Sequence, residues 1–194
     1  HTGRLLIALC ALAISAWAQQ PSAGLAGPVT GFIFDAQLGA VRPMLGLPGA
    51  AYLGPSTAAG PASASVAPDA SAALAVQPGG KLVLYTGLRG AAPVALAVSG
   101  GIAGADRFAW APNSKAGSPA AIYSSVSGQA QIVTSLAPFP AAAAPIDLSG
   151  LPGPVTALAF DGQRVIVGVA SGETGGIYVA TASAGIERIA TAAS

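Results

Sequence analysis

The sequence is poor in charged and reactive side chains. Only 8% of its 194 residues are charged, and it contains one cysteine and one histidine. Cys10 and His1 both lie in residues 1–18, which we predict to be a secretory signal peptide removed on export. The mature chain would then have no disulfide, no cysteine or histidine catalytic pair and no imidazole or thiolate zinc site.

The predicted signal peptide has the usual three parts. Arg4 precedes the apolar run LLIALCALAISAWA, and Ala16 and Ala18 supply small residues before a cleavage site, with Gln19 as the first mature residue. An uncleaved membrane helix is the alternative, although the run is short for one. Lipidation of Cys10 is disfavoured because Leu9 stands where a small residue is required.

Long apolar runs and an excess of one charge are also missing. After residue 18 no stretch is long enough to cross a membrane as a helix, so we expect no membrane span once the signal is removed. The mature chain carries seven basic and seven acidic residues. This balance argues against a nucleic-acid partner, since phosphate binding needs a clustered basic surface.

One phrase is repeated in the chain. GPVTGFIFDA at 27–36 returns as GPVTALAFDG at 153–162, with six of ten positions identical and an interval of 126 residues. Three units of about 42 residues fit this interval, and about 40–45 residues is the length of a four-stranded propeller blade. We therefore expect an all-β β-propeller of four-stranded antiparallel blades, with about four blades present, over residues 19–194. The expected units are 28–64, 65–105, 106–152 and 153–194.

Short polar residues mark the corresponding turn of each unit. Each follows a short apolar segment, and together they form a ladder of Asp35, Asp69, Asn113 and Asp161. We interpret these as structural turn residues, because short polar side chains accept hydrogen bonds from nearby backbone N–H groups.

The fourth unit has the clearest strand pattern. Short runs rich in Val, Ile, Thr and Tyr, at 155–160, 164–170, 177–181 and 186–190, are separated by Gly, Asp or Ser. Asp161-Gly162 predicts a type I′ hairpin turn, which needs positive φ at both central positions. The run at 164–170 is almost continuously apolar and predicts a strand covered on both faces. Helix is the competing prediction for this Ala-rich chain, but Pro and Gly interrupt every Ala-rich stretch.

These residues resemble a known family. The segments Trp110-Ala111-Pro112-Asn113 and Val66-Ala67-Pro68-Asp69 are similar to the turn of the WD40-like propeller repeats of exported bacterial proteins. The chain departs from that pattern, since Ala replaces the usual Ser and Gly follows only Asp161. Four blades form only a small ring, so we expect a truncated ring, with a closed four-bladed ring or pairing with a partner as alternatives.

The sequence contains no catalytic, cofactor-binding or metal-binding motif that we can identify. The acids lack the spacing of a calcium loop or of an acid–base pair. We expect an exported, non-catalytic propeller scaffold that binds a protein, peptide or glycan, located in the periplasm, at the cell surface or outside the cell. The first alternative is a propeller-type hydrolase or lactonase with a metal site in the channel, built from Asp35, Asp69 and Asp161. An outer-membrane or surface-layer structural protein is the other.

Overall fold

The chain folds into four antiparallel β-sheets. The computed structural model describes residues 27–112, 118–136 and 138–191, so the predicted signal peptide lies outside the described residues. Among the described residues there is no α-helix, and only a single 3₁₀ turn, η1 (Gly172–Thr174), interrupts the strands. No helix in this part of the chain is long and apolar enough to span a membrane. The all-β fold class predicted from the sequence is confirmed.

The first two sheets use the first half of the described chain. Sheet 1 contains β1 (Val29–Asp35), β2 (Ala40–Leu45), β3 (Tyr52–Leu53) and β4 (Ala58–Ala59). Sheet 2 contains β5 (Ser63–Val66), β6 (Ala72–Val76), β7 (Leu82–Thr86) and β8 (Val94–Ala97). The boundary expected between residues 64 and 65 lies within β5.

The other two sheets follow in order. Sheet 3 contains β9 (Arg107–Trp110), β10 (Ala120–Ser124), β11 (Gln129–Ser135), β12 (Ala141–Ala142) and β13 (Ile146–Asp147). Sheet 4 contains β14 (Val155–Phe160), β15 (Val165–Val169), β16 (Gly176–Thr181) and β17 (Gly185–Thr191). Sheet 4 is a simple meander in which each strand pairs with the next.

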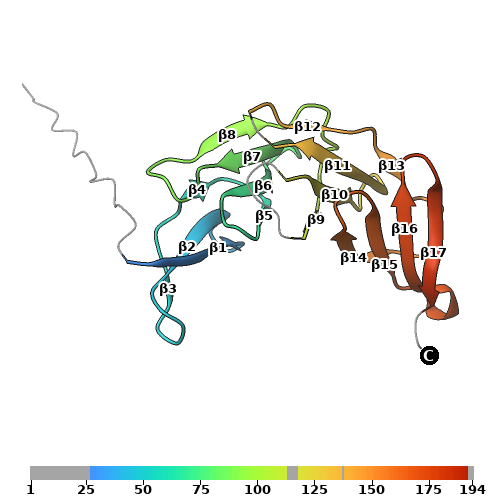
Figure 1. Ribbon diagram of the computed structural model, residues 1–194, viewed down its shortest axis with the longest axis horizontal. Coiled ribbons are helices and arrows are strands. Elements are labelled where there is room, and N and C mark those ends of the chain that lie inside the picture. Colours follow the sequence, from blue (N-terminus) through green and yellow to red (C-terminus); the bar gives the residue numbers. More distant parts are fainter. Residues whose placement is uncertain (1–26, 113–117, 137, 192–194) are drawn as a thin grey trace, which may run out of the picture.

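The four sheets stand side by side in an open arch (Figure 1). The first strands β1, β5, β9 and β14 lie toward the concave side, and later strands such as β8, β12 and β17 lie toward the convex side. Sheet 1 and sheet 4 form the two ends of the arch, which turn toward the same side. Open, consecutive four- and five-stranded sheets of this kind are consistent with an incomplete propeller.

Buried clusters join consecutive sheets. Sheets 1 and 2 share a cluster that includes Phe32, Val41, Ala73 and Ala75. A second cluster joins sheets 2 and 3, with Leu84 and Ile122 among its members, and a third joins sheets 3 and 4. Sheets 2 and 3 therefore bury both faces, whereas each end sheet buries one.

Polar bonds reinforce the central pair of sheets. Gln131 in β11 is 1% exposed, and its side-chain amide bonds to the backbone of Gly100, Ile102 and Ala143 at 2.6–2.8 Å. Its oxygen and both of its N–H groups are thus occupied. Ser99, which follows sheet 2, also forms a parallel bridge with Ala141 of β12. Hydrogen bonds as well as packing connect sheets 2 and 3.

The repeated phrase builds the same local structure twice. The register shifts by one residue at Thr30 in β1 and at Thr156 in β14, as in a β-bulge. At each bulge the threonine hydroxyl donates to a carbonyl across the strand pair: Thr30 to Met44 at 3.1 Å and Thr156 to Gly168 at 3.2 Å. The phrase therefore encodes the first strand of sheets 1 and 4, including its bulge.

The two copies of the phrase pack their equivalent side chains against different neighbours: the sheet that follows in one case, and the sheet that precedes in the other. Phe34 of sheet 1 packs toward sheet 2, which follows it, and the equivalent Phe160 of sheet 4 packs toward sheet 3, which precedes it. Both copies thus turn the same face toward the middle of the arch, and their other faces point outward. A regular rotational repeat would point both copies in one direction, so the two end sheets are not related by simple rotation.

Two local predictions for sheet 4 were wrong. Gly162 has a φ of +102°, but Asp161 has no positive φ, so the turn is not type I′. The β14–β15 loop is instead four residues long, since Phe160 pairs with Val165. The β15 strand is covered on one face only, because sheet 4 is the end of the arch: Val165 and Val167 are fully buried and the residue between them is half-buried.

Candidate functional site

The aspartates of the turn ladder lie in separate turns. Asp35 Oδ1 accepts hydrogen bonds from the backbone N–H groups of Gln37 and Leu38 at 3.1 and 3.3 Å. Asp161 Oδ1 accepts from Gln163 and Arg164 at 2.9 and 2.7 Å. In both cases one carboxylate oxygen holds the turn and the other pairs with an arginine.

Of the other two residues of the turn ladder, the structure describes Asp69 but not Asn113. Asp69 Oδ1 accepts from the backbone N–H and the hydroxyl of Ser71 at 3.0 and 2.7 Å. Asn113 lies outside the described residues. Asp147 was not part of the predicted ladder, yet its carboxylate accepts the N–H of Ser149 at 2.9 Å. It is the second residue of the two-residue strand β13, which gave no recognisable strand pattern in the sequence.

Hydrogen bonding holds these carboxylates in the charged form. Arg42 lowers the pKa of Asp35, and the N–H groups of Leu38 and Gln37 lower it further. The backbone N–H groups of Arg164 and Gln163, followed by the Arg164 side chain, lower the pKa of Asp161 to about 2. The N–H of Ser149 lowers the pKa of Asp147.

The aspartates do not form a common site. Asp35, Asp69 and Asp161 belong to sheets 1, 2 and 4, and the bonds described above serve each one's own turn. Among the residues that the structure describes, no group of three or more His, Cys, Asp or Glu side chains is placed to hold a metal ion. Asp35, Asp69 and Asp161 are therefore not placed to share one metal ion.

Trp110 lies between sheets rather than on an open surface. Its indole N–H donates to the hydroxyl of Ser65 at 3.1 Å, so it connects β9 with β5. Its ring is half-buried and packs against the cluster between sheets 2 and 3. With its polar atom already bonded and its ring partly covered, Trp110 is a weak candidate for stacking on a ligand.

The outward face of sheet 1 lies at one end of the arch. We define the end face of sheet 1 as Ile33, Arg42, Met44 and Leu53, which share one side of the sheet by strand alternation and register. These positions alternate with Phe32 and its neighbours, which pack toward sheet 2. The end face of sheet 1 therefore points away from the rest of the arch.

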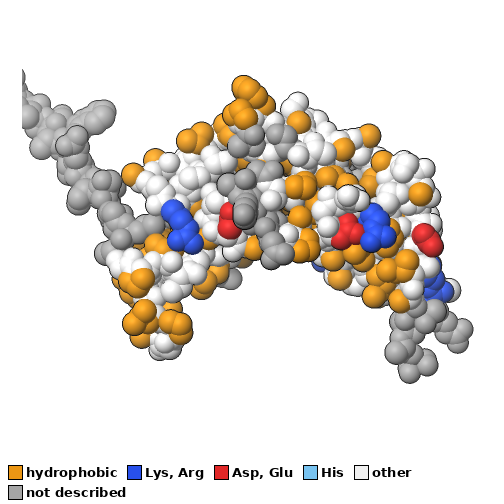
Figure 2. All heavy atoms as spheres, viewed as in Figure 1, with side chains coloured by type: hydrophobic (Ala, Val, Ile, Leu, Met, Phe, Trp, Pro, Cys, Tyr) orange, Lys and Arg blue, Asp and Glu red, His pale blue; other side chains and the backbone are white. Residues whose placement is uncertain are grey.

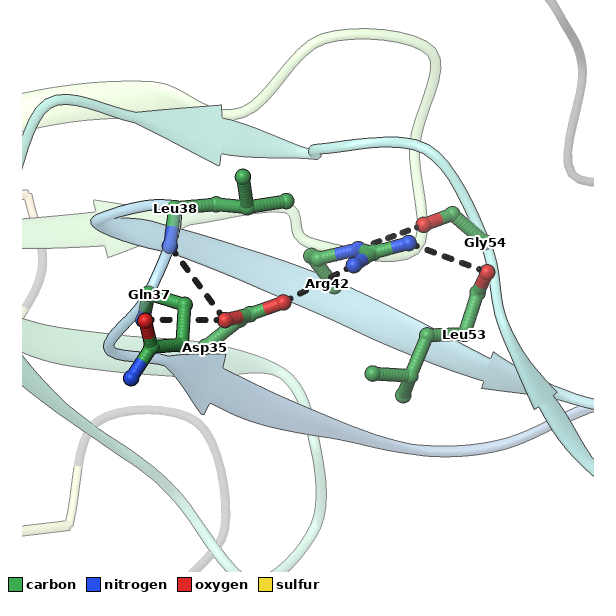
Figure 3. A network of polar contacts seen from close by, with 6 residues as sticks. All are labelled: Asp35, Gln37, Leu38, Arg42, Leu53 and Gly54. Atoms are coloured by element: carbon green, nitrogen blue, oxygen red, sulfur yellow. Dashed lines mark hydrogen bonds and ion pairs between the residues drawn. The ribbon is translucent and has the colours of Figure 1, made fainter.

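Arg42 organises this face (Figure 3). Its guanidinium pairs with Asp35 at 2.8 Å and donates to the carbonyls of Gly54 and Leu53 at 2.8 and 3.1 Å. The edge of sheet 1 is broken between β3 and β4, at Pro55, where the chain cannot continue the ladder. Arg42 thus bonds two carbonyls at the break and fixes the position of β3.

A small apolar cavity opens at the β2–β3 hairpin. It has a volume of about 110 Å³ and is lined by Met44, Ala51, Tyr52 and Leu53. Tyr52 is 59% exposed, and Leu47, in the loop of the same hairpin, is 66% exposed. Figure 2 shows hydrophobic side chains gathered over this hairpin at the lower left of the molecule. Exposed large apolar residues around a cavity are typical of an interaction surface.

The outward face of sheet 4 is also apolar but has smaller side chains. We define the end face of sheet 4 as the residues that alternate with the buried ones on β14, β15 and the start of β16: Ala157, Ala159, Ile166, Gly168 and Ile177. Ile177 is 43% exposed. In Figure 2 hydrophobic side chains also gather at this end of the arch, over β14 and β15.

Neither surface was predictable from a sequence motif. From the sequence alone Tyr52 is interpreted as a strand residue, and Arg42 is one of several arginines dispersed along the chain. The one available signal was the irregularity of the first unit, where Pro43 and Pro55 interrupt the strand pattern. A search of protein-family models and a search of curated proteins found no match to the chain.

Proposed function

We propose that this protein is an exported, non-catalytic scaffold of WD40-like propeller sheets that binds a protein or peptide partner through the exposed β2–β3 hairpin of sheet 1. The observation that carries the proposal is the apolar cavity beside Tyr52 and Leu53, on a hairpin that Arg42 holds in place. Aromatic and aliphatic side chains around a cavity are the usual anchors of protein interfaces.

The chemistry of the surface favours a protein or peptide over a glycan. A glycan site needs several polar groups aimed at sugar hydroxyls, together with an open aromatic ring. The residues lining the cavity are apolar apart from the Tyr52 hydroxyl, and the guanidinium of Arg42 is already bonded to Asp35 and two carbonyls. An apolar side chain of a partner is the group that suits this cavity.

A displayed peptide library tests this function. The purified protein is immobilised sparsely, so that single chains are exposed, and peptides are selected on wild type, on Tyr52→Asp and on Val126→Asp. Val126 is 90% exposed in the turn between β10 and β11 of sheet 3, away from the β2–β3 hairpin, and is the matched control. We expect peptides with large apolar residues to be enriched on wild type and on Val126→Asp but not on Tyr52→Asp. Equal enrichment on all three proteins, or none on wild type, would refute the proposal.

A further inference from the structure

Strand β3 lies at the edge of sheet 1, and β4 continues that edge after the break at Pro55. The pairing of β3 with β2 shows which of its backbone groups are used. The N–H of Gly54 donates to the carbonyl of Pro43 at 2.8 Å, so these two residues form a hydrogen-bonded pair of the antiparallel ladder. Hydrogen-bonded and non-hydrogen-bonded pairs alternate along such a ladder.

This alternation turns the backbone of Leu53 away from β2. Leu53 lies opposite Met44, one position from the bonded pair, so its N–H and C=O point to the open edge. Ala51 lies two residues earlier and has the same orientation. The N–H of Gly46, opposite Ala51 in this register, donates to Pro28 at 3.0 Å instead of to Ala51, as the alternation requires.

Arg42 already bonds one of these outward groups (Figure 3). Its guanidinium donates to the carbonyl of Leu53 at 3.1 Å and to that of Gly54 at 2.8 Å. Pro43 has no N–H, so Arg42 supplies the donor that the ladder would otherwise give to Gly54. In the part of the chain that the structure describes, the open edge of β3 therefore offers the N–H groups of Ala51 and Leu53 but only the carbonyl of Ala51.

The apolar cavity lies along this same edge. Three of its four lining residues are Ala51, Tyr52 and Leu53. Recognition by strand addition uses these two elements together, since main-chain hydrogen bonds hold an extended segment and a pocket takes one of its alternate side chains. By contrast, β17 at the edge of sheet 4 carries Glu187 and Arg188, and charged side chains protect an edge from pairing.

We propose that the β2–β3 hairpin binds an extended peptide segment of its partner as an added strand along β3, antiparallel like the other strand pairs of sheet 1. This rests on the proposed function, since it names how the same hairpin recognises its partner. The peptide residue opposite Ala51 exchanges two hydrogen bonds with it. Its side chain lies on the same face as those of Ala51 and Leu53, at the cavity, so this position takes a large apolar residue.

The contact of Arg42 with Leu53 predicts a second feature of the peptide. The residue opposite Leu53 comes two positions before the large apolar residue, and its N–H meets a carbonyl that Arg42 already bonds. Proline, which has no N–H, suits that position. Sheet 1 itself contains the same arrangement, because Pro43 lies opposite Gly54 and Arg42 bonds the Gly54 carbonyl. The substrate class is thus an extended segment with proline, any residue and a large apolar residue in succession.

Backbone methylation of a bound peptide tests the strand pairing on the wild-type protein. The probe is the tightest peptide selected on wild type, resynthesised with each backbone N–H methylated in turn, and its affinity is measured by calorimetry. Methylation of the large apolar residue should weaken binding at least about 5-fold, because a hydrogen bond is lost. Methylation two residues earlier should have little effect.

The outcomes separate this inference from the proposed function. Equal effects at all positions, or none at any, would overturn strand addition and leave the proposed function intact. A selection that yields no peptide on wild type would overturn both.

A pair of variants tests the donor on the protein. Leu53→Pro removes the outward N–H, and an edge strand tolerates proline where its nitrogen faces away from the sheet. Leu53→Val keeps the N–H and an apolar side chain and is the matched control. We expect Leu53→Pro to bind the peptide at least about 5-fold more weakly and Leu53→Val to bind close to wild type. In wild type, bound peptide should slow amide exchange at Leu53; unchanged exchange, or equal binding by the two variants, would contradict the pairing.

Discussion

Replacing Arg42 should selectively loosen the edge of sheet 1. Arg42→Met keeps much of the aliphatic volume but removes the hydrogen bonds to the carbonyls of Leu53 and Gly54. Hydrogen bonds to charged groups contribute about 1.5–3 kcal/mol each. The Arg42 side chain is 20% exposed, so we take the lower end and expect a loss of about 3 kcal/mol for the two bonds.

Hydrogen exchange is the assay that localises this loss. The N–H groups of Gly54 and Thr57 each donate at 2.8 Å to carbonyls of β2, at Pro43 and Val41. If the edge opens more readily by about 3 kcal/mol, these two amides should exchange on the order of 100-fold faster. Amides in β10, in the centre of the arch, should be unaffected, because the clusters couple sheet 1 directly to sheet 2 only.

Arg164→Met is the matched control. Arg164 also pairs with an aspartate at 2.8 Å, but its side chain is 57% exposed and the pair lies within one turn. Exposed pairs contribute little, so we expect no acceleration at Gly54. Arg42→Lys keeps the charge but not the planar fork, and should give an intermediate effect. Equal behaviour of Arg42→Met and Arg164→Met would refute the assignment of Arg42 to the strand break.

Three further outcomes are expected. The lowered carboxylate pKa values, about 2 for Asp161, mean that these groups stabilise the fold above their ordinary pKa of 3.8 and that this stability is lost as the pH falls from about 4 toward about 2. Thermal unfolding across that range should show the loss, and Asp161→Asn should flatten it; an unchanged slope would contradict the assigned hydrogen bonds. Leu84→Ala should cost about 3 kcal/mol in urea unfolding, because Leu84 is 0% exposed between sheets 2 and 3, while Val94→Ala, at an exposed edge, should be nearly neutral. Expression of the full chain in a bacterial host should yield a periplasmic or secreted product whose N-terminal sequence begins at Gln19; a product retaining residues 1–18 would contradict the signal-peptide assignment.

The fold class was predictable because its determinants are local. The alternation of Val, Ile and Thr with Gly and Asp marks the four strands of sheet 4 closely, and the repeated phrase marks the first strands of sheets 1 and 4. β3 and β4 were not predictable, because each is only two residues long and depends on pairing with β2. Their position follows from contacts with Arg42, which no local pattern encodes.

The candidate site was not predictable for a related reason. Whether Leu53 or Phe32 faces outward depends on which side of sheet 1 packs on sheet 2, and no local sequence pattern specifies that side. In the structure, packing between the sheets places the same face of both copies toward the middle of the arch. This packing leaves the β2–β3 hairpin and the two end faces exposed.

The hydrogen bonds of Gln131 connect the two central sheets of the arch, so these two sheets can keep their arrangement when an end sheet changes. Sheets 2 and 3 are joined by this buried amide and by the Ser99–Ala141 bridge as well as by side-chain packing. The two outer sheets each pack on a single inner sheet. An insertion, deletion or exchange of a whole sheet at either end would leave the central pair unchanged. The molecule can therefore vary in length, during evolution or in engineering, by gaining or losing sheets at its ends. The two central sheets would keep their own pairing and their contact with each other.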